Sequence, residues 1–336
     1  MPVLIVVLGV LCALLVVAPA SAGPTGPAPA SGAAAQEGHG GDGDDGAHED
    51  CVPVETQFAA ARSPRAVGHT TYTEAQLRVV DRRMRRSVRT ARRSGATPAP
   101  PGVALRIGVH VHVVQGTGRG EKGPGRRKVR RQLGVLNDAF AGGQSRRNVA
   151  TPFRFHVASH QRVTNDRWFR SGVLGRDRAA GAMRRTLHRG TRRDLNLYIA
   201  APTVSGSGLL GYATAPWDAR RRPRLDGVTI HRGTLPGGSL APYHRGDTAV
   251  HEVGHWLGLL HTFEGGCEGR GDRVADTPAE AGPNYTCDTN ADSCPDDPGK
   301  DPVRNFMSYT PDGCMNHFTQ GQVRRMGRAW FGFRAS

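Results

Sequence analysis

The chain has 336 residues, and its 45 lysine and arginine residues outnumber its 29 aspartate and glutamate residues, which gives a net charge of +16. This length is enough for one large or two modest domains with a hydrophobic core. A strong positive charge is typical of nucleic-acid-binding proteins, but no basic stripe interleaved with aromatic residues and no recognition-helix motif accompanies it. We therefore exclude a specific nucleic-acid partner and expect solvated arginines with non-specific affinity for acidic polymers.

The N-terminus has the pattern of a targeting segment. Residues 1–22 form an apolar run that ends in Ala20-Ser21-Ala22 and predict a secretory signal peptide cleaved after Ala22. No Lys or Arg lies near Met1, so an uncleaved membrane anchor is the alternative. No later segment contains the ~20 apolar residues that a membrane span needs. The sequence predicts a secreted, extracellular protein without a membrane span after signal removal.

Composition divides the rest of the chain into three parts. Residues 23–50 are rich in Gly, Ala, Pro and Asp and predict a disordered linker, because they cannot form a core. Residues 51–100 are expected to be a pro-segment. Within it, Tyr72–Arg93 has apolar residues at helical spacing behind Thr73, a suitable N-cap, and the stretch SGATPAPPG then breaks the chain. Residues 101–336 are expected to form the catalytic domain.

The periodicity of the catalytic region predicts an α/β (α+β) fold. Alternating apolar residues indicate strands, and apolar residues three and four apart indicate helices. The order β-α-β-α-β-β-β predicts a sheet with helices packed on it, leading into a further helix. The predicted segments are strand 103–114, helix 128–140, strand 151–159, helix 176–189 and strands within 195–200, 208–217 and 225–231.

The stretch VHEVGHWLGLLHTF has the spacing of a metal site. His251 and His255 are four residues apart, so on a helix both imidazoles can reach one zinc ion at roughly 2.0–2.1 Å. Gly258 tolerates positive φ and lets the chain leave the helix sharply, which would bring His261 back as a third ligand. Three protein ligands leave one position open for water, as in a catalytic zinc site.

Glu252 lies beside these ligands without being one of them. A carboxylate in this place can take a proton from a zinc-activated water as the water attacks a peptide carbonyl. The alternative is an ordinary buried helix with hydrogen-bonded histidines. Three histidines and a glutamate among Val250, Trp256 and Leu260 would be a costly core without a metal. The pattern therefore favours a catalytic zinc site.

The pattern H-E-x-x-H-x-x-G-x-x-H, from His251 to His261, resembles the metzincin zinc peptidases. NFMSY resembles their Met-turn, in which Met307 would lie beneath the zinc. A finer resemblance is to the pappalysin family, through GDTAVHEVGHWLGLLHTFEGGC, GDRVADTP and CMNHFTQGQVRRM. This resemblance covers roughly Val103–Met326.

The resemblance implies a metzincin-like fold with an N-terminal twisted mixed sheet, helices that include the zinc-binding helix, and an irregular C-terminal subdomain stabilised by disulfides. It implies a zinc endopeptidase that acts on proteins or peptides, with Glu252 as general base. Tyr309 would stabilise the oxyanion. The strand around GLLGYATAPW would lie along the cleft edge and bind the substrate as an added strand. Some relatives cleave beside basic residues, and Asp312 is a candidate acidic residue for such a pocket.

Four cysteines cluster near the C-terminus, and an even set in a secreted protein predicts two disulfides. Four cysteines allow three connectivities. The resemblance implies the pairs Cys267–Cys294 and Cys287–Cys314. The family also includes calcium-binding members. Asp272, Asp276 and Thr277 and the acidic run 288–301 offer oxygen ligands, and the alternative is a solvated acidic loop.

Cys51 is an odd cysteine far upstream of that cluster. Its thiolate could take the open position of the zinc and keep the enzyme latent as a zymogen until cleavage. A free thiol or a disulfide between chains is the alternative. Cleavage at the pairs Arg82-Arg83, Arg85-Arg86 or Arg92-Arg93 would release the catalytic domain.

A function of a different class is also consistent with the charge. A basic secreted module could bind polyanions and keep a zinc ion for structure alone, and its binding would weaken strongly with salt. A structural zinc site has no need of Glu252 or of an open ligand position. The residue pattern therefore favours the peptidase.

Overall fold

The computed structural model describes residues 55–58, 72–98, 102–174, 177–204 and 207–335. The expected signal peptide (1–22), the expected linker (23–50) and Cys51 lie outside the described residues.

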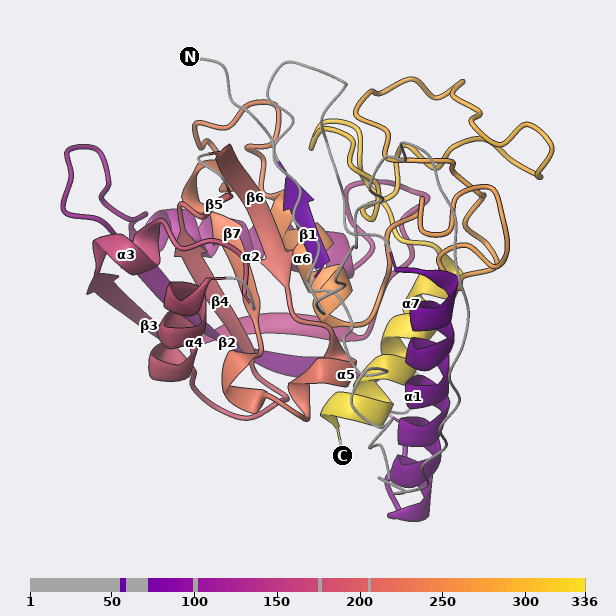
Figure 1. The fold of residues 1–336 in the computed structure, drawn as a ribbon, viewed down its shortest axis with the longest axis horizontal. Coiled ribbons are helices and arrows are strands. Elements are labelled where there is room, and N and C mark those ends of the chain that lie inside the picture. The colour runs from indigo at the N-terminus through magenta and orange to yellow at the C-terminus, as the bar shows by residue number, and fades with distance from the viewer. Residues whose placement is uncertain (1–54, 59–71, 99–101, 175–176, 205–206, 336) are drawn as a thin grey trace, which may run out of the picture. The chain divides into compact units, whose positions relative to one another are not determined.

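A twisted mixed sheet with the strand order β1-β6-β7-β4-β2-β3 forms the centre of the domain (Figure 1). Neighbouring strands among β3, β2, β4 and β7 run parallel, whereas β6 runs antiparallel to β7 and β1 antiparallel to β6. The short β5 pairs with β6. This architecture confirms the predicted α/β sheet. The strands are β1 (Glu55–Phe58), β2 (Leu105–Gln115), β3 (Phe153–Thr164), β4 (Leu195–Ala200), β5 (Thr203–Val204), β6 (Ser207–Ala213) and β7 (Val228–His231).

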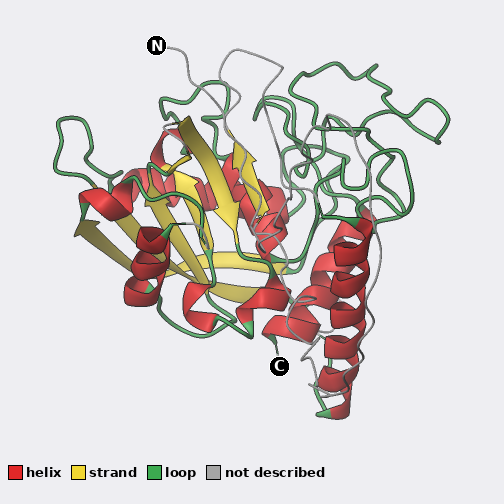
Figure 2. Ribbon diagram, viewed as in Figure 1, coloured by secondary structure: helices red, strands yellow, loops and turns green. Residues whose placement is uncertain are grey.

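Helices pack on both faces of this sheet and beside it (Figure 2). In the part of the chain that the structure describes, no helix combines the length and apolarity needed to cross a bilayer. The helices are α1 (Glu74–Arg93), α2 (Arg126–Phe140), α3 (Asp166–Phe169), α4 (Arg178–Leu187), α5 (Pro216–Ala219), α6 (Asp247–Trp256) and α7 (Gln320–Ala329), with short helical turns η1 (Pro223–Leu225), η2 (Arg232–Thr234) and η3 (Trp330–Arg334).

The alternation of side chains along β2 explains how two layers of helices form. Val111 and Val113 belong to the main core, together with apolar residues of α2 and α6. Val114 belongs to a separate cluster with residues of α3 and α4. Successive side chains of a strand point to opposite faces, so one buried strand serves both cores. The sheet thus fixes α6 on the same face as α2.

Helix α1 packs directly on elements of the expected catalytic domain. Thr73 and Gln76 form a reciprocal capping box at its start, as the sequence suggested for Thr73. Leu77 and Val80, on its apolar face, are fully buried in a cluster with Trp217 of α5 and other residues of the C-terminal half. Figure 1 shows α1 lying alongside α7. An apolar face buried this way stabilises the domain by the hydrophobic effect.

The chain between α6 and α7 is the irregular C-terminal subdomain. The described residues there form no helix or strand beyond an isolated bridge between Asn305 and His317. The cysteines are joined as Cys267–Cys294 and Cys287–Cys314. This is the pairing that the family resemblance implied. Disulfides substitute here for the hydrogen-bonded ladders that the subdomain lacks.

Candidate metal centre

Three histidine side chains converge at the C-terminal end of α6. The Nε2 atoms of His251 and His255 are 2.9 Å apart, and those of His255 and His261 are 3.1 Å apart. In the described ranges this trio is the group of side chains that could hold a metal ion. Tetrahedral zinc with bonds near 2.05 Å would hold its nitrogen ligands about 3.3 Å apart. The triad therefore has the spacing and the donor type that a single zinc ion needs.

Backbone carbonyls orient two of these rings. Nδ1 of His251 lies 2.7 Å from the carbonyl oxygen of Phe306, and Nδ1 of His255 lies 3.0 Å from that of Leu259. When each Nδ1–H donates to its carbonyl, the Nε2 lone pair faces the centre of the triad. Burial lowers the pKa of His251 to about 4 and the pKa of His255 well below its ordinary value. Both rings are therefore neutral at neutral pH, which is the metal-binding form.

Gly258 ends α6 as the sequence predicted. Its φ is +94°, in the left-handed region. The N–H of Gly258 donates to the carbonyl of His255 at 2.8 Å, and the N–H of Leu259 donates to that of Gly254 at 3.0 Å. These two bonds are the Schellman arrangement. The reversal carries the chain back toward the other two histidines at His261.

We predict that Gly258→Ala destabilises the protein and weakens zinc binding. Alanine in the left-handed region costs roughly 1–2 kcal/mol. A Cβ at Gly258 would also lie 2.8 Å from the Cβ of Ala329, and such overpacking costs roughly 1–3 kcal/mol more. Gly237→Ala is the matched control, because Gly237 has a φ of +72° and a Cβ there would meet no atom within 4 Å. Urea unfolding should show the larger loss for Gly258→Ala, and equal losses would contradict this reading.

Glu252 lies on α6 between the first two histidines and is completely buried. Neither of its carboxylate oxygens has a hydrogen-bond partner among the described residues. Burial raises the pKa of Glu252 well above its ordinary value, and the charge of Arg184 offsets part of this rise. A buried carboxylate without a partner is costly. Its two oxygens therefore suit a polar group beside a metal, such as a water molecule or a substrate amide.

Within the irregular subdomain, Met307 packs against α6 at Gly254, the residue before His255. A Cβ placed on Gly254 of α6 would lie 2.5 Å from the Met307 sulfur, so the Met307 side chain would have to move to make room for one. The N–H of Met307 donates to Oδ1 of Asn305 at 2.9 Å, which shapes the turn. Tyr309 follows and is buried, with its ring centroid 4.9 Å from that of His261. The Tyr309 ring therefore packs against the rings of His251 and His261, whereas Met307 packs against α6 beside His255.

The Asp312 carboxylate caps the N-terminal end of α6. Its Oδ2 accepts backbone N–H bonds from Arg245 at 2.7 Å and from Gly246 at 3.0 Å. Gly246, the N-cap residue, has no side chain to do so. The carboxylate that the sequence suggested for a basic-specificity pocket therefore caps the helix that carries the histidines.

A buried ion pair supports the end of α6 and was not foreseen from the sequence. Arg334 donates to both oxygens of Asp226, at 2.8 and 3.2 Å, and to the carbonyl of Trp256 at 2.9 Å. Burial alone would raise the pKa of Asp226, but the charge and hydrogen bonds of Arg334, together with Thr214 and Trp256, bring it below its ordinary value. This network fixes the last turn of the helix before Gly258.

The acidic residues suggested for calcium have separate partners. Asp276 accepts bonds from the Thr319 hydroxyl at 2.8 Å and the Gly321 N–H at 2.7 Å, so it caps α7. Oδ1 of Asp272 accepts from the Thr277 hydroxyl at 2.8 Å, whereas its Oδ2 has no partner among the described residues. Burial raises the pKa of Asp272 to about 7. Asp272 and Thr277 line a pocket of about 340 Å³.

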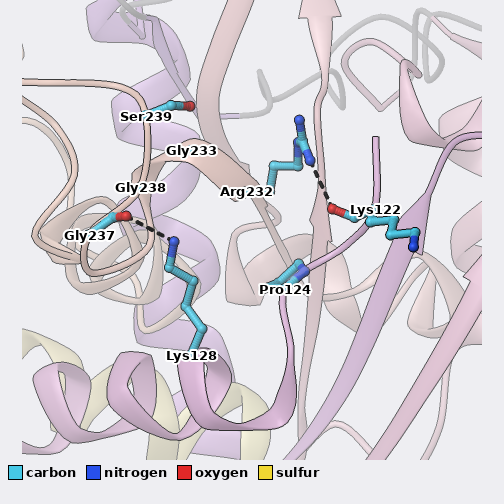
Figure 3. A pocket seen from close by; sticks show the side chains of 8 residues that line it. All are labelled: Lys122, Pro124, Lys128, Arg232, Gly233, Gly237, Gly238 and Ser239. Carbon is cyan, nitrogen blue, oxygen red and sulfur yellow. Dashed lines mark hydrogen bonds between the residues drawn. The ribbon is translucent and has the colours of Figure 1, made fainter. Parts of the chain in front are cut away.

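A second pocket, of about 320 Å³, lies at the ends of the parallel strands (Figure 3). It is lined by Lys122, Lys128 and Arg232 and by no residue of the histidine centre. Lys128 donates to the carbonyl of Gly237 at 2.9 Å, and Arg232 donates to that of Lys122 at 2.8 Å. Two of its three cations therefore already bond to backbone carbonyls.

A mixed sheet with a histidine-bearing helix packed on it, a glycine turn after that helix and a methionine packed against it define a zinc metallopeptidase of the metzincin class. A family model described as pregnancy-associated plasma protein-A matches residues 238–330. An extracellular metalloprotease of Pyricularia oryzae is 42% identical over 234 residues, which are 69% of this chain and 77% of the relative. An extracellular metalloprotease of Colletotrichum graminicola is 39% identical over 284 residues, which are 83% of this chain and 94% of the relative. The chain belongs to the pappalysin family.

Solved structures of mirolysin from Tannerella forsythia share this fold. A promirolysin mutant superposes with a TM-score of 0.61 and 27% identity, over 78% of this chain and 91% of that chain. Mature mirolysin in complex with a cleaved peptide gives a TM-score of 0.56 and 28% identity, over 70% of this chain and 97% of that chain. Membership in a peptidase family favours the enzyme over the polyanion-binding module.

Proposed function

We propose that this protein is a secreted zinc endopeptidase made as a zymogen. His251, His255 and His261 would hold the zinc, and Glu252 would act as general base. The observation that carries the proposal is the convergence of three buried imidazoles beside a buried carboxylate that has no hydrogen-bond partner among the described residues. Relatives named extracellular metalloproteases support secretion.

The residues of the site divide the reaction among them. Zinc, when bound, polarises the substrate carbonyl and lowers the pKa of the attacking water. Glu252 accepts a proton from the water as the new C–O bond forms. It then gives this proton to the amide nitrogen as the C–N bond breaks, so the proton count balances. Tyr309, packed on the histidine rings, would stabilise the charge that develops on the carbonyl oxygen.

The outer edge of β6 is the proposed substrate strand site. An extended peptide can pair with such an edge and gain main-chain hydrogen bonds. In this structure β1 occupies the edge, with Thr56 opposite Tyr212 and Gln57 opposite Gly211. An N-terminal segment on the substrate edge would compete with substrate. This pairing and the likeness to promirolysin support the zymogen proposal.

The packing of α1 bears on where the inhibitory segment ends. We propose that α1 stays with the catalytic domain and that activation removes residues before Tyr72, because α1 buries its apolar face on Trp217 and Phe333. The arginine pairs of α1 lie within a helix, whereas proteases act on extended chain. Cys51 stays a candidate latency thiol, and its contacts lie outside the described residues.

We also propose a calcium ion as a second cofactor beside the zinc. Asp272 and Glu280 are buried carboxylates of the irregular subdomain, each with one oxygen that has no partner among the described residues. A bound cation would offset their desolvation. Asp276 is less suited, since both its oxygens bond to the start of α7.

The zymogen proposal predicts that weakening the pairing of β1 activates the unprocessed chain. Proline has no N–H for a ladder bond, so Thr56→Pro/Gln57→Pro should loosen β1 from β6. We expect at least a tenfold rise in hydrolysis of a fluorescence-quenched peptide by the full chain, abolished by a zinc chelator. Cys51→Ser, assayed in parallel, measures the contribution of the thiol.

Two results would contradict parts of this proposal. An unprocessed proline variant no more active than the wild type, with active processed enzyme, would mean that β1 does not cause latency. A zinc-loaded, processed enzyme that cleaves no peptide would contradict the peptidase itself.

A further inference from the structure

Gly211 lies at the middle of β6, where the strand meets the helix of the metal centre. It pairs with Ile230 of β7 on one side and with Gln57 of β1 on the other. Gly211 is not one of the glycines with a positive φ, so its backbone conformation does not itself require glycine. The absence of a side chain must therefore have another cause.

The geometry around Gly211 supplies this cause. A Cβ placed there would lie 2.8 Å from Cγ and 2.9 Å from Oε1 of Glu252. It would also lie 3.0 Å from the carbonyl oxygen of Thr229. The Thr229 oxygen belongs to the neighbouring strand and cannot move far. A side chain at position 211 would therefore push Glu252 away from the sheet.

No described residue fixes the Glu252 carboxylate by hydrogen bonding, because neither of its oxygens has a partner among them. Its position is set by packing, and Gly211 is the surface that it packs on. Gly208 lies on the same strand, and a Cβ there would meet nothing within 4 Å. Close approach of the carboxylate to β6 is therefore specific to position 211.

We infer that Gly211 is a positioning residue for catalysis, whose bare α-carbon seats the Glu252 carboxylate against β6 at the distance that the reaction requires. This inference rests on the proposed role of Glu252 as general base. Small displacements of a reacting group lower the rate strongly, because catalysis depends on near-attack geometry.

The test uses Gly211→Ala and the control Gly134→Ala, made in the full chain and assayed after processing. Gly134 lies in α2, and a Cβ there would meet no atom within 4 Å. We expect Gly211→Ala to lower kcat by a factor of 10–100 with KM within twofold and zinc content unchanged. Gly134→Ala should leave all three unchanged. A rise in KM with unchanged kcat would overturn the inference, because Gly211 would then make room for substrate rather than for Glu252.

A double-mutant cycle separates positioning from a general effect on the strand. Gly211→Ala should lower the melting temperature in the wild type and by less than half as much in the Glu252→Ala background, where Cγ is gone. This readout needs no activity and applies even if the single variant folds poorly. Equal losses in both backgrounds would overturn the inference. Activity in Glu252→Gln would instead overturn the proposed function, so the two failures are distinguishable.

Discussion

Replacement of Glu252 by glutamine is expected to reduce peptide hydrolysis by a factor of about 10²–10⁴ while zinc stays bound, because the amide keeps the shape of the side chain but cannot accept the proton. The carboxylate lies beside the histidines without being one of the converging ligands. Its loss should therefore remove the base and spare the metal. The measurement is hydrolysis of a quenched peptide by the processed enzyme, beside zinc content by atomic absorption.

His255→Ala provides the comparison for this result. It removes the central nitrogen of the triad, 2.9 and 3.1 Å from its neighbours, so both zinc and activity should be lost. A Glu252→Gln enzyme with zinc and near-wild-type activity would show that another group takes the proton. A Glu252→Gln enzyme without zinc would show that the carboxylate helps to hold the metal.

The largest loss of stability is expected for Arg334→Leu. This change leaves the Asp226 carboxylate buried without its cation and removes two bonds to the carbonyl of Trp256. Breaking one partner of a buried ion pair costs roughly 3–5 kcal/mol. In a domain of this size the melting temperature should fall by roughly 6–20 °C. Because Arg334 holds the last residue of α6, zinc affinity should fall with it.

Arg328→Leu is the matched control, since Arg328 is exposed on the preceding helix. Its free energy of unfolding should change by no more than about 0.5 kcal/mol. Adding Asp226→Leu to Arg334→Leu should restore part of the lost stability, because no charge is then left unpaired. An Arg334→Leu protein that melts within 2 °C of the wild type would contradict the role given to this pair.

Local patterns were sufficient to predict much of this molecule. Alternation along β2 and helical spacing in α1 and α2 predicted these elements, because burial selects apolar residues at the period of each structure. The ending of α6 was predictable as well, since the turn at Gly258 depends on one residue and its backbone conformation. These features are determined within a few residues of sequence.

The supports of the metal centre could not be found in this way. Asp312 caps α6 across 65 residues or more, and Arg334 reaches Asp226 across 108. A lone aspartate or arginine in a chain with 45 basic residues carries no local signal of its partner. The pairing of β1 with β6 was missed for the same reason, because register between distant strands depends on the whole fold. The need for glycine at position 211 likewise becomes apparent only in the folded chain, where Glu252 lies against it.

The most direct test of the central claim is the position of zinc in crystals of the processed enzyme, measured by anomalous diffraction at the zinc edge. We predict a single strong peak at about 2.0–2.1 Å from the Nε2 atoms of His251, His255 and His261, with the remaining position open to a non-protein ligand. A zinc ion bound elsewhere, or one enclosed by four protein ligands in the processed enzyme, would contradict a catalytic metal at this centre.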